Sequence, residues 1–219
     1  MINITEEEFF QLLREEAEPV RELMTYFKCA MMEIETKFRV LDEQFSLTHD
    51  RNPIESISTR LKSPESIFAK MKRKNLRRDI KAIETEIFDV AGIRVICSFE
   101  DDIYMLRDCL LSQDDITLIK EKDYIKNPKS NGYRSLHLIV EVPIFLKNEK
   151  RPMKVEIQLR TIAMDSWASL EHRLRYKKNL SEETQKEIAD KLMQCADISA
   201  ELDAIMLSIK KTVSKETGM

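Results

Sequence analysis

Two short segments of alternating polar and apolar residues constrain the fold of this chain more than any other feature. The first covers residues 129–137 and reads KSNGYRSLH, and the second covers residues 155–160 and reads VEIQLR. Because successive side chains of a β-strand point to opposite faces, each segment predicts a strand with one apolar face and one chemically varied face. The varied face carries Tyr133, Ser135, His137, Glu156, Gln158 and Arg160.

The mixture of groups on this face decides how we interpret it. The wetted face of a half-exposed sheet also alternates, and it is the common case. Such a face tends to repeat Lys, Glu and Thr, whereas this one combines a phenol ring, an imidazole, a carboxylate, an amide and a guanidinium. We therefore interpret the two segments as parts of a ligand-binding surface.

Glycine is too scarce for a phosphate-binding loop built from backbone. The chain of 219 residues has only three glycines, Gly92, Gly132 and Gly218. P-loops and dinucleotide-binding turns need several glycines within a few residues. If this protein binds nucleotide phosphates, arginine and lysine side chains must hold them.

A basic run supplies such side chains. Between residues 60 and 81 the acids are only Glu65 and Asp79. The whole chain, by contrast, has a net charge of −3. This overall charge argues against a protein that coats nucleic acid in general. A solvated helix face is the usual explanation of a charge run, but a local basic excess in an acidic protein favours a phosphate-rich partner. The basic residues of the run are Arg60, Lys62, Lys70, Lys72, Arg73, Lys74, Arg77, Arg78 and Lys81.

Two apolar stripes predict long helices near the two ends of the chain. Steps of three and four residues are typical of a helix with a narrow apolar face. Packing within one chain explains such stripes without a partner, but their length relative to a small sheet favours a homo-oligomer. The first stripe is Met24, Phe27, Met31, Ile34, Phe38, Leu41 and Phe45, and the second is Ile188, Leu192, Cys195, Ser199, Leu202, Met206, Ile209 and Val213.

Between these helices the pattern predicts a small mixed sheet backed by helices, which is an α+β fold. We expect five short strands in a sheet of nucleotidyltransferase-like type, and a helix that Ser63 and Pro64 begin. Pro143 is expected to end the strand that follows Gly132. The expected divisions are an N-terminal helical extension over 1–50, a central domain over 51–178 and a C-terminal helix over 179–219.

The cysteines and the N-terminus predict a cytoplasmic protein. No two cysteines have CxxC spacing, and their apolar surroundings predict buried, reduced thiols. The first residues have neither a basic region nor a long apolar run, so we expect no signal peptide and no membrane span. The four cysteines are Cys29, Cys97, Cys109 and Cys195.

Two carboxylates are candidates for holding a metal ion. Asp89 precedes one predicted strand and Glu156 lies within another. Two carboxylates on adjacent strands can hold Mg²⁺ together with substrate phosphates, and a free carboxylate can act as a general base. For Asp89 alone, a structural role in a turn is an alternative. Arg94 lies in the strand that Asp89 precedes and can reach the phosphates from there. Tyr133 has a ring suited to stacking on a base.

The histidines give no metal site of their own. His49, His137 and His172 have no metal-ligand spacing, which argues against a zinc site. His49 and Asp50 form an HD dipeptide of the kind used by metal-dependent phosphohydrolases, but the further ligands are missing, so we interpret it as a loop sequence. Without a nucleophile constellation, the pattern favours phosphoryl transfer between two nucleotides by positioning and charge neutralisation.

Four ordered motifs resemble the synthetase motifs of the Rel-type (p)ppGpp synthetases. They are DVAGIR at 89–94, KSNGYRSLH at 129–137, VEIQLRT at 155–161 and WASLEH at 167–172. The resemblance runs from about residue 50 to 178. The short length and the flanking helices are similar to the stand-alone small alarmone synthetases, close to the RelP branch. The resemblance implies transfer of pyrophosphate from ATP to the 3′-OH of GDP or GTP. It also implies that the hydrolase and regulatory domains of the long enzymes are absent.

The resemblance also implies roles for individual residues and for assembly. Asp89 would be a Mg²⁺ ligand, and Glu156 would assist the metal and deprotonate or orient the 3′-OH. Tyr133 would stack on guanine. Members of the small family are homotetramers, and some bind an alarmone allosterically. The acceptor nucleotide would be surrounded by Lys129, His137 and Gln158, and ATP would be held by Arg60, Lys62, Lys70, Arg73 and Arg94.

Two alternatives stay open at this stage. One is a non-catalytic RNA-binding module that uses the basic run and Tyr133, with steep salt dependence and no need for Asp89. The other is a small nucleotidyl transferase, which would release pyrophosphate where the leading hypothesis releases AMP. Product analysis separates all three.

Overall fold

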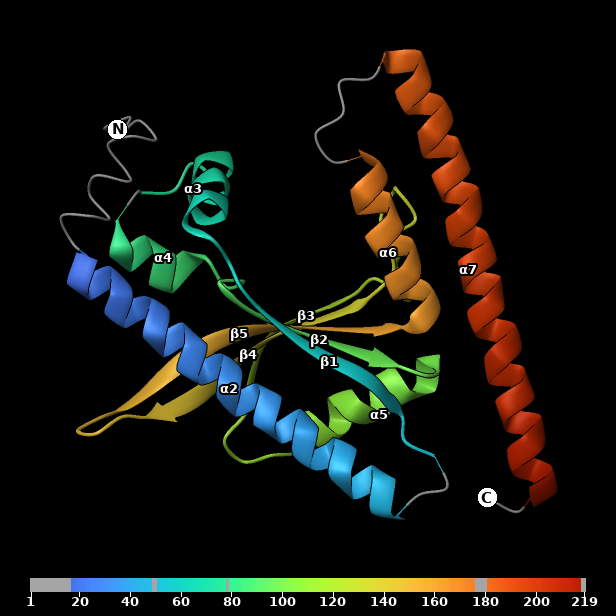
Figure 1. The fold of residues 1–219 in the computed structure, drawn as a ribbon, viewed down its shortest axis with the longest axis horizontal. Helices are drawn as coiled ribbons and strands as arrows, with labels where there is room; N and C mark the ends of the chain where they lie inside the picture. The colour runs from blue at the N-terminus through green and yellow to red at the C-terminus, as the bar shows by residue number, and fades with distance from the viewer. Residues whose placement is uncertain (1–16, 49–50, 78, 176–180, 218–219) are drawn as a thin grey trace.

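The computed structural model describes residues 17–48, 51–77, 79–175 and 181–217. The HD dipeptide at residues 49–50 lies outside the described residues, so its interpretation as a loop sequence stays a prediction. The described chain forms a twisted sheet with helices on both of its faces (Figure 1).

The sheet has five strands in the order β1-β2-β5-β4-β3. The β2–β5 pair at its centre is parallel and the other pairs are antiparallel, which confirms the predicted mixed sheet. A parallel pair needs a long crossover, and here the crossover contains α5, β3 and β4. The strands are β1 Ile54–Leu61, β2 Ala91–Cys97, β3 Thr117–Asp123, β4 Leu136–Phe145 and β5 Lys150–Thr161.

The helices divide between the two faces of the sheet. Figure 1 shows α2 and α5 below the sheet, with α3 and α6 on the opposite side and α7 alongside α6. Ser63 caps α3 by accepting a hydrogen bond from the Ser66 amide, and Pro64 is its first residue, as predicted. The helices are α2 Ala17–Thr48, α3 Pro64–Arg73, α4 Ile80–Glu86, α5 Glu100–Leu111, α6 Ile162–Arg175 and α7 Glu182–Thr217.

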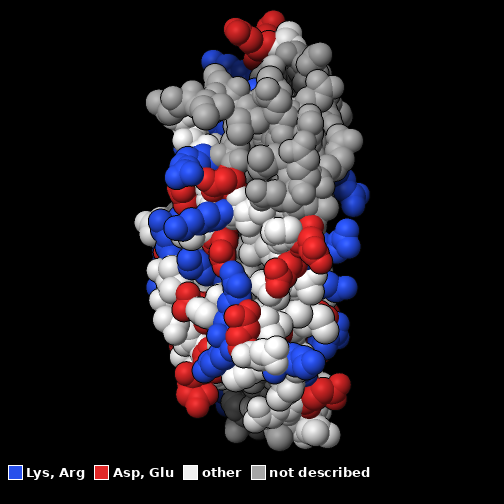
Figure 2. Space-filling view, turned by 90° about the vertical axis from the view of Figure 1, so that its left-hand side faces the viewer, with Lys and Arg blue, Asp and Glu red and all other residues white. Residues whose placement is uncertain are grey.

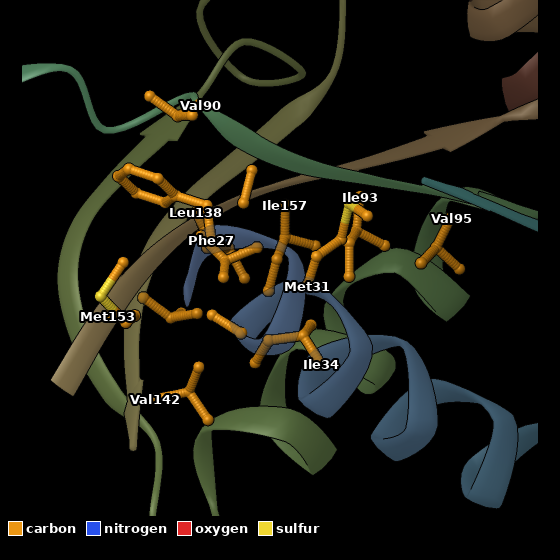
Figure 3. Packing of buried hydrophobic residues seen from close by; sticks show 14 of the residues in the cluster. Phe27, Met31, Ile34, Val90, Ile93, Val95, Leu138, Val142, Met153 and Ile157 are labelled. Carbon is orange, nitrogen blue, oxygen red and sulfur yellow. The ribbon is translucent and has the colours of Figure 1, made fainter. Parts of the chain in front are cut away.

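The core lies between α2 and the apolar face of the sheet. Ile34 and Phe38 of α2 are completely buried. Packing within one chain therefore accounts for the first apolar stripe, and that stripe needs no partner subunit. Figure 3 shows Phe27, Met31 and Ile34 among strand residues that include Ile93, Val95, Leu138, Val142 and Ile157.

The second stripe is only partly covered by the described chain. In the N-terminal half of α7, Leu192 and Ala196 are buried against Trp167 of α6, whose indole nitrogen donates a hydrogen bond of 2.9 Å to the Leu192 carbonyl. Further along, Leu202 and Ile209 remain about half exposed, at 50% and 51%. The two stripes have the same spacing in sequence, yet only the first is largely buried by its own chain, with Met24 and Leu41 partly buried.

The predicted strand over 129–137 is largely wrong. β4 begins at Leu136, and Gly132 has φ +87°, a conformation that belongs to turns. The Asn131 side chain accepts a hydrogen bond from the Tyr133 amide at 3.2 Å, which is typical of an Asx turn. Ser135 is buried and donates to the Leu159 carbonyl at 3.0 Å, so it does not belong to the varied face. The alternation there comes from a loop.

The predicted end of the strand at Pro143 is also wrong. β4 continues to Phe145, with Pro143 opposite Pro152 of β5. The β3 pairing stops at Glu141 and the β2 pairing begins at Glu156, so this end of the β4–β5 hairpin projects beyond its neighbours. At Pro143, β4 has no neighbour on its β3 side, so the proline removes no hydrogen bond to β3. The strand therefore tolerates it.

The thiol and membrane expectations have different outcomes. All four cysteines are free; Cys97 is buried and Cys29 and Cys109 are partly buried, but Cys195 is exposed, which corrects the expectation of four buried thiols. Within the described ranges, no helix combines the length and apolarity needed to cross a membrane.

The packing of α2 gives a stability prediction. We expect Ile34→Ala to lower the free energy of unfolding by about 2–5 kcal/mol, because it leaves a cavity beneath the sheet. The matched variant Val40→Ala, at a residue of the same helix that is 61% exposed, should change it by at most about 0.5 kcal/mol. Urea unfolding followed by circular dichroism at one protein concentration measures both values. Equal losses in the two variants would contradict the packing of α2 on the sheet.

Candidate active site

A cavity of about 500 Å³ opens on the sheet face opposite α2. Its floor comes from β1, β2 and β5, and Ser66 of α3 contributes to one wall. The residues predicted for the site that line this cavity are Arg60, Lys62, Asp89, Arg94, Glu156 and Gln158.

The strand register explains why these residues meet. One row across the sheet pairs Arg60 with Gly92 and Gly92 with Glu156. Gly92 therefore leaves open space between a guanidinium and a carboxylate. A Cβ atom at Gly92 would meet the Arg60 carbonyl at 3.5 Å, an ordinary contact, so the backbone itself does not require glycine there. We infer that glycine at this position keeps the cavity open between Arg60 and Glu156.

A neighbouring row extends the site towards β4. Arg94 of β2 pairs with Gln158 of β5, and Gln158 pairs with His137 of β4. The predicted donor-side arginine and two predicted acceptor-side residues therefore stand side by side on one face of the sheet.

Asp89 is held as an ionised carboxylate. Burial raises its pKa, but the hydrogen bonds and the positive charges of Lys62 and Lys70 together outweigh burial, and the pKa lies below its ordinary value. The lysine nitrogens lie 2.7 Å and 2.5 Å from Asp89 Oδ2. The other oxygen, Oδ1, is buried and has no hydrogen-bond partner among the described residues. A charged carboxylate that lines the cavity and keeps one oxygen without a hydrogen bond is suited to bind a cation.

Glu156 is likewise ionised. Burial raises its pKa, whereas hydrogen bonds from His137 and Gln158 lower it, and the net shift is downward. His137 Nδ1 lies 3.5 Å from Glu156 Oε1, and Gln158 Nε2 donates to Oε2 at 3.0 Å. The charge of Asp89 acts in the opposite direction on the pKa of Glu156, because the two carboxylates line the same cavity.

This donor set fits a magnesium ion better than a metal held by protein alone. Within the described part of the chain, no group of three or more His, Cys, Asp and Glu side chains could hold a metal ion. Mg²⁺ is usually bound through one or two carboxylates, with substrate phosphates and water completing the shell. Asp89 and Glu156 supply such a pair, and the free Oδ1 of Asp89 is the ligand atom that the fold leaves unused.

An aromatic cluster adjoins the cavity at the β4 side. The Tyr133 hydroxyl lies 2.7 Å from His137 Nε2, and its ring is only partly buried. The Lys129 ammonium lies 4.4 Å from the centre of the Tyr133 ring and 4.6 Å from that of Tyr124. The structure thus brings together Lys129, Tyr133 and His137, as predicted, and adds Tyr124, which the sequence pattern did not single out.

Arg160 is a site residue to which sequence reasoning gave no role. It is buried, and one of its nitrogens donates to the Tyr133 hydroxyl at 2.7 Å and to Gln158 Oε1 at 2.9 Å. Another nitrogen donates to Asp165 of α6 at 2.9 Å, and Asp165 also pairs with Arg94 at 3.2 Å. The sequence did contain a signal for Arg160, because its spacing places it on the same face of β5 as Glu156. Nothing in the sequence pattern indicated that Asp165 would join the two arginines.

One predicted residue lies away from the cavity. Arg73 is exposed in the last turn of α3 and is not among the lining residues, whereas Ser66 and Lys70 stand nearer to Asp89. The role of Arg73 in holding ATP stays a prediction. His172 of α6 is exposed and also lies outside the cavity lining.

Comparisons with known proteins agree with this geometry. The model of the family described as the region found in RelA / SpoT proteins matches residues 59–181. GTP pyrophosphokinase YwaC of Bacillus subtilis is 47% identical over 88% of this chain and 90% of its own length. GTP pyrophosphokinase YjbM of the same organism is 33% identical over 86% and 87%.

Solved structures show the same fold. The crystal structure of small alarmone synthetase 2 from Bacillus subtilis superposes with a TM-score of 0.79 at 42% identity, covering 89% of this chain and all of that one. That of small alarmone synthetase 1 from the same organism, bound to its product pppGpp, gives 0.79 at 32% identity over 88% and 97%. With its matched motifs, its two-carboxylate cavity and this fold, the chain belongs to the RelA/SpoT family, among the small alarmone synthetases.

Proposed function

We propose that this protein is a GTP pyrophosphokinase that transfers the β,γ-pyrophosphate of ATP to the 3′-OH of GDP or GTP, giving (p)ppGpp and AMP. The observation that carries the proposal is the pair of ionised carboxylates, Asp89 and Glu156, in one cavity beside a lysine pair and an aromatic cluster. The relatives' names support the same activity. Such synthesis serves the stringent response, and we place it in the cytoplasm.

The basic side of the cavity suits the donor. Lys62 and Lys70 present two ammonium groups, and Arg60 and Arg94 add guanidinium groups along the neighbouring strands. These four side chains would hold the triphosphate of ATP without a glycine-rich loop. Asp89 and Glu156 would hold Mg²⁺, which supplies charge neutralisation to the phosphates when bound. A structure of small alarmone synthetase 1 bound to AMPCPP supports a donor site in this fold.

The aromatic side suits the acceptor. Tyr133 would stack on guanine, and Lys129, His137 and Gln158 would contact the rest of the nucleotide. The 3′-oxygen attacks the β-phosphorus of ATP, the bond from the β-phosphorus to the oxygen of the α-phosphate breaks, and AMP leaves. Glu156 accepts the proton of the 3′-OH, for which its lowered pKa keeps it ionised. The proposal does not include hydrolysis of the product.

The role of Glu156 is open to direct test. Glu156→Gln should lower kcat by about 10²–10⁴-fold, because an amide cannot take up the proton of the 3′-OH. Glu141→Gln on the neighbouring strand β4, outside the cavity lining, is the matched control and should retain full activity. The rate of AMP formation from ATP and GDP measures both. Full activity in Glu156→Gln would remove the assigned role.

Product identity and metal dependence form a second test. With ATP, GDP or GTP and Mg²⁺ we expect AMP and a guanosine nucleotide with a 3′-pyrophosphate, separated by ion-exchange chromatography. EDTA should stop the reaction, because the phosphates lack their counter-charge once the metal is removed. Added Mg²⁺ should restore it. Release of pyrophosphate would instead indicate a nucleotidyl transferase, and unchanged turnover in EDTA would contradict the metal proposal.

Nothing in the comparisons favours the RNA-binding alternative. On the side of the molecule seen in Figure 2, Lys and Arg side chains are interleaved with Asp and Glu. A surface that tracks a nucleic-acid backbone needs a basic stripe or patch. Lys62 and Lys70 are engaged with Asp89 in the cavity. We therefore keep nucleotide chemistry as the function of the basic run.

We propose that the protein assembles as a homotetramer through α7. The supporting observation is the uncovered part of the second stripe, where Leu202, Met206, Ile209 and Val213 are 44–51% exposed on one long helix. Such a contiguous apolar face is typical of an interaction surface. A second copy of this chain presents the same stripe, so the face can pair with itself. The number of four subunits is what the resemblance to the small alarmone synthetases implies.

Light scattering after size exclusion tests the assembly. We expect a mass four times the 25.8 kDa of the chain. Ile209→Glu should shift the protein to smaller species, because it buries a charge in the apolar contact. Lys211→Glu, at an exposed residue of the same helix, should not. A wild-type protein that elutes as a monomer or as a dimer at micromolar concentration would overturn the proposal.

A further inference from the structure

Helix α7 contacts three consecutive residues of the loop that carries Tyr133. We call residues 129–135 the acceptor loop, because under the proposed function they present the guanine-stacking ring. Gly132, Tyr133 and Arg134 each meet α7. Helix α7 itself does not line the cavity, so its contacts with the loop need an explanation of their own.

The backbone of the loop lies directly on α7 at Gly132. A Cβ atom at this position would lie 2.5 Å from the Ala196 Cβ and 3.3 Å from the Met193 sulfur, and the glycine has φ +87°. Only glycine fits both the backbone conformation and the distance. The loop therefore cannot move towards α7, and its path depends on where the helix lies.

The next residue uses the same helix as a support. The Tyr133 ring packs partly against the cluster of Trp167, Leu192 and Ala196, which joins α6 to α7. Its hydroxyl is fixed from the other side by His137 and Arg160. The orientation of the ring is thus set jointly by the sheet and by α7.

Arg134 ties the loop to α7 by charge. Its side chain is 10% exposed, and one nitrogen lies 2.9 Å from Asp203 Oδ2 while the other lies 2.7 Å from Glu100 Oε2 of α5. The Asp203 side chain is only 6% exposed. Breaking either of the two ion pairs leaves a largely buried guanidinium with only one acidic partner, so the arrangement favours this one loop position.

We propose that Asp203 is a positioning residue for the acceptor nucleotide: through Arg134 it holds the acceptor loop so that Tyr133 faces the bound guanine. Asp203 does not line the cavity; besides Arg134 it has a side-chain hydrogen bond with Thr161 at the end of β5, and its proposed action on the acceptor runs through Arg134 and the loop. The inference rests on the proposed function, because it assigns the acceptor to Tyr133. It predicts that a defect at Asp203 weakens binding of GDP and GTP and spares binding of ATP.

A second ion pair on the same helix provides a matched control. Lys210 of α7 pairs with Asp101 at 2.7 Å and with Asp102 at 3.1 Å. Both acids lie in the first turn of α5, and neither belongs to the acceptor loop or the cavity lining. Removing Lys210 weakens the attachment of α7 without touching the loop, so it separates positioning from general stability.

The experiment compares Asp203→Ala, Asp203→Asn and Lys210→Gln in steady-state kinetics with each substrate varied. Asp203→Ala should raise the KM for GDP and GTP about tenfold while the KM for ATP stays within about twofold, because only acceptor binding is impaired. Asp203→Asn keeps an oxygen that accepts from Arg134, so its effect should be smaller, about threefold. Lys210→Gln should leave both KM values within about twofold.

Two further measurements make the outcome decisive. Thermal unfolding establishes that each variant is folded, and calorimetric titration with GDP and with a non-hydrolysable ATP analogue measures binding without turnover. An unchanged acceptor KM in a folded Asp203→Ala protein overturns the inference, as does an equal rise in Lys210→Gln. If the wild-type protein forms no AMP, the proposed function fails instead. GDP binding that is lost in Asp203→Ala but kept in Lys210→Gln would still support the role of Asp203 in holding the loop.

Discussion

The site depends on acids that stay ionised although they are largely buried. Burial alone would raise the pKa of Asp89 and of Glu156 and favour their neutral forms. Lys62 and Lys70 reverse this for Asp89, and His137 and Gln158 reverse it for Glu156. The groups that keep the acids charged are also the groups proposed to bind the nucleotides. The side chains that organise the electrostatics of the cavity are therefore the ones proposed to recognise the substrates.

Much of the sheet and the core of the site could be predicted, because both follow from local patterns. The alternation at 155–160 gave β5 and the position of Glu156, and the basic run with few glycines gave the lysine pair. The alternation at 129–137 misled, because Asn131 and Gly132 build a turn whose residues alternate by accident. A period of two describes spacing along the chain and does not distinguish a strand from a tight loop.

What could not be predicted depends on contacts between distant segments. Arg160 stands on the predicted face, but its bonds to Tyr133 and Asp165 follow from the way the acceptor loop and α6 fold back onto β5. The two apolar stripes show the same limit. Ile34 and Ile209 occupy equivalent places in like patterns, yet one is completely buried under the sheet and the other is half exposed. Spacing predicts the helix, whereas its surroundings decide what the apolar face covers.

The parallel pairing of β2 and β5 has a consequence for the order in which the protein acquires its activity. Asp89 stands just before β2, and Glu156 stands 67 positions later in β5, with α5, β3 and β4 between them. Long-range pairing of this kind forms slowly, because the entropy of closing the intervening chain is lost before the contacts can compensate for it. During synthesis on the ribosome, a nascent chain from which β5 has not yet emerged carries only one of the two carboxylates. The complete pair therefore forms late in synthesis, in a single step, when β5 pairs with β2.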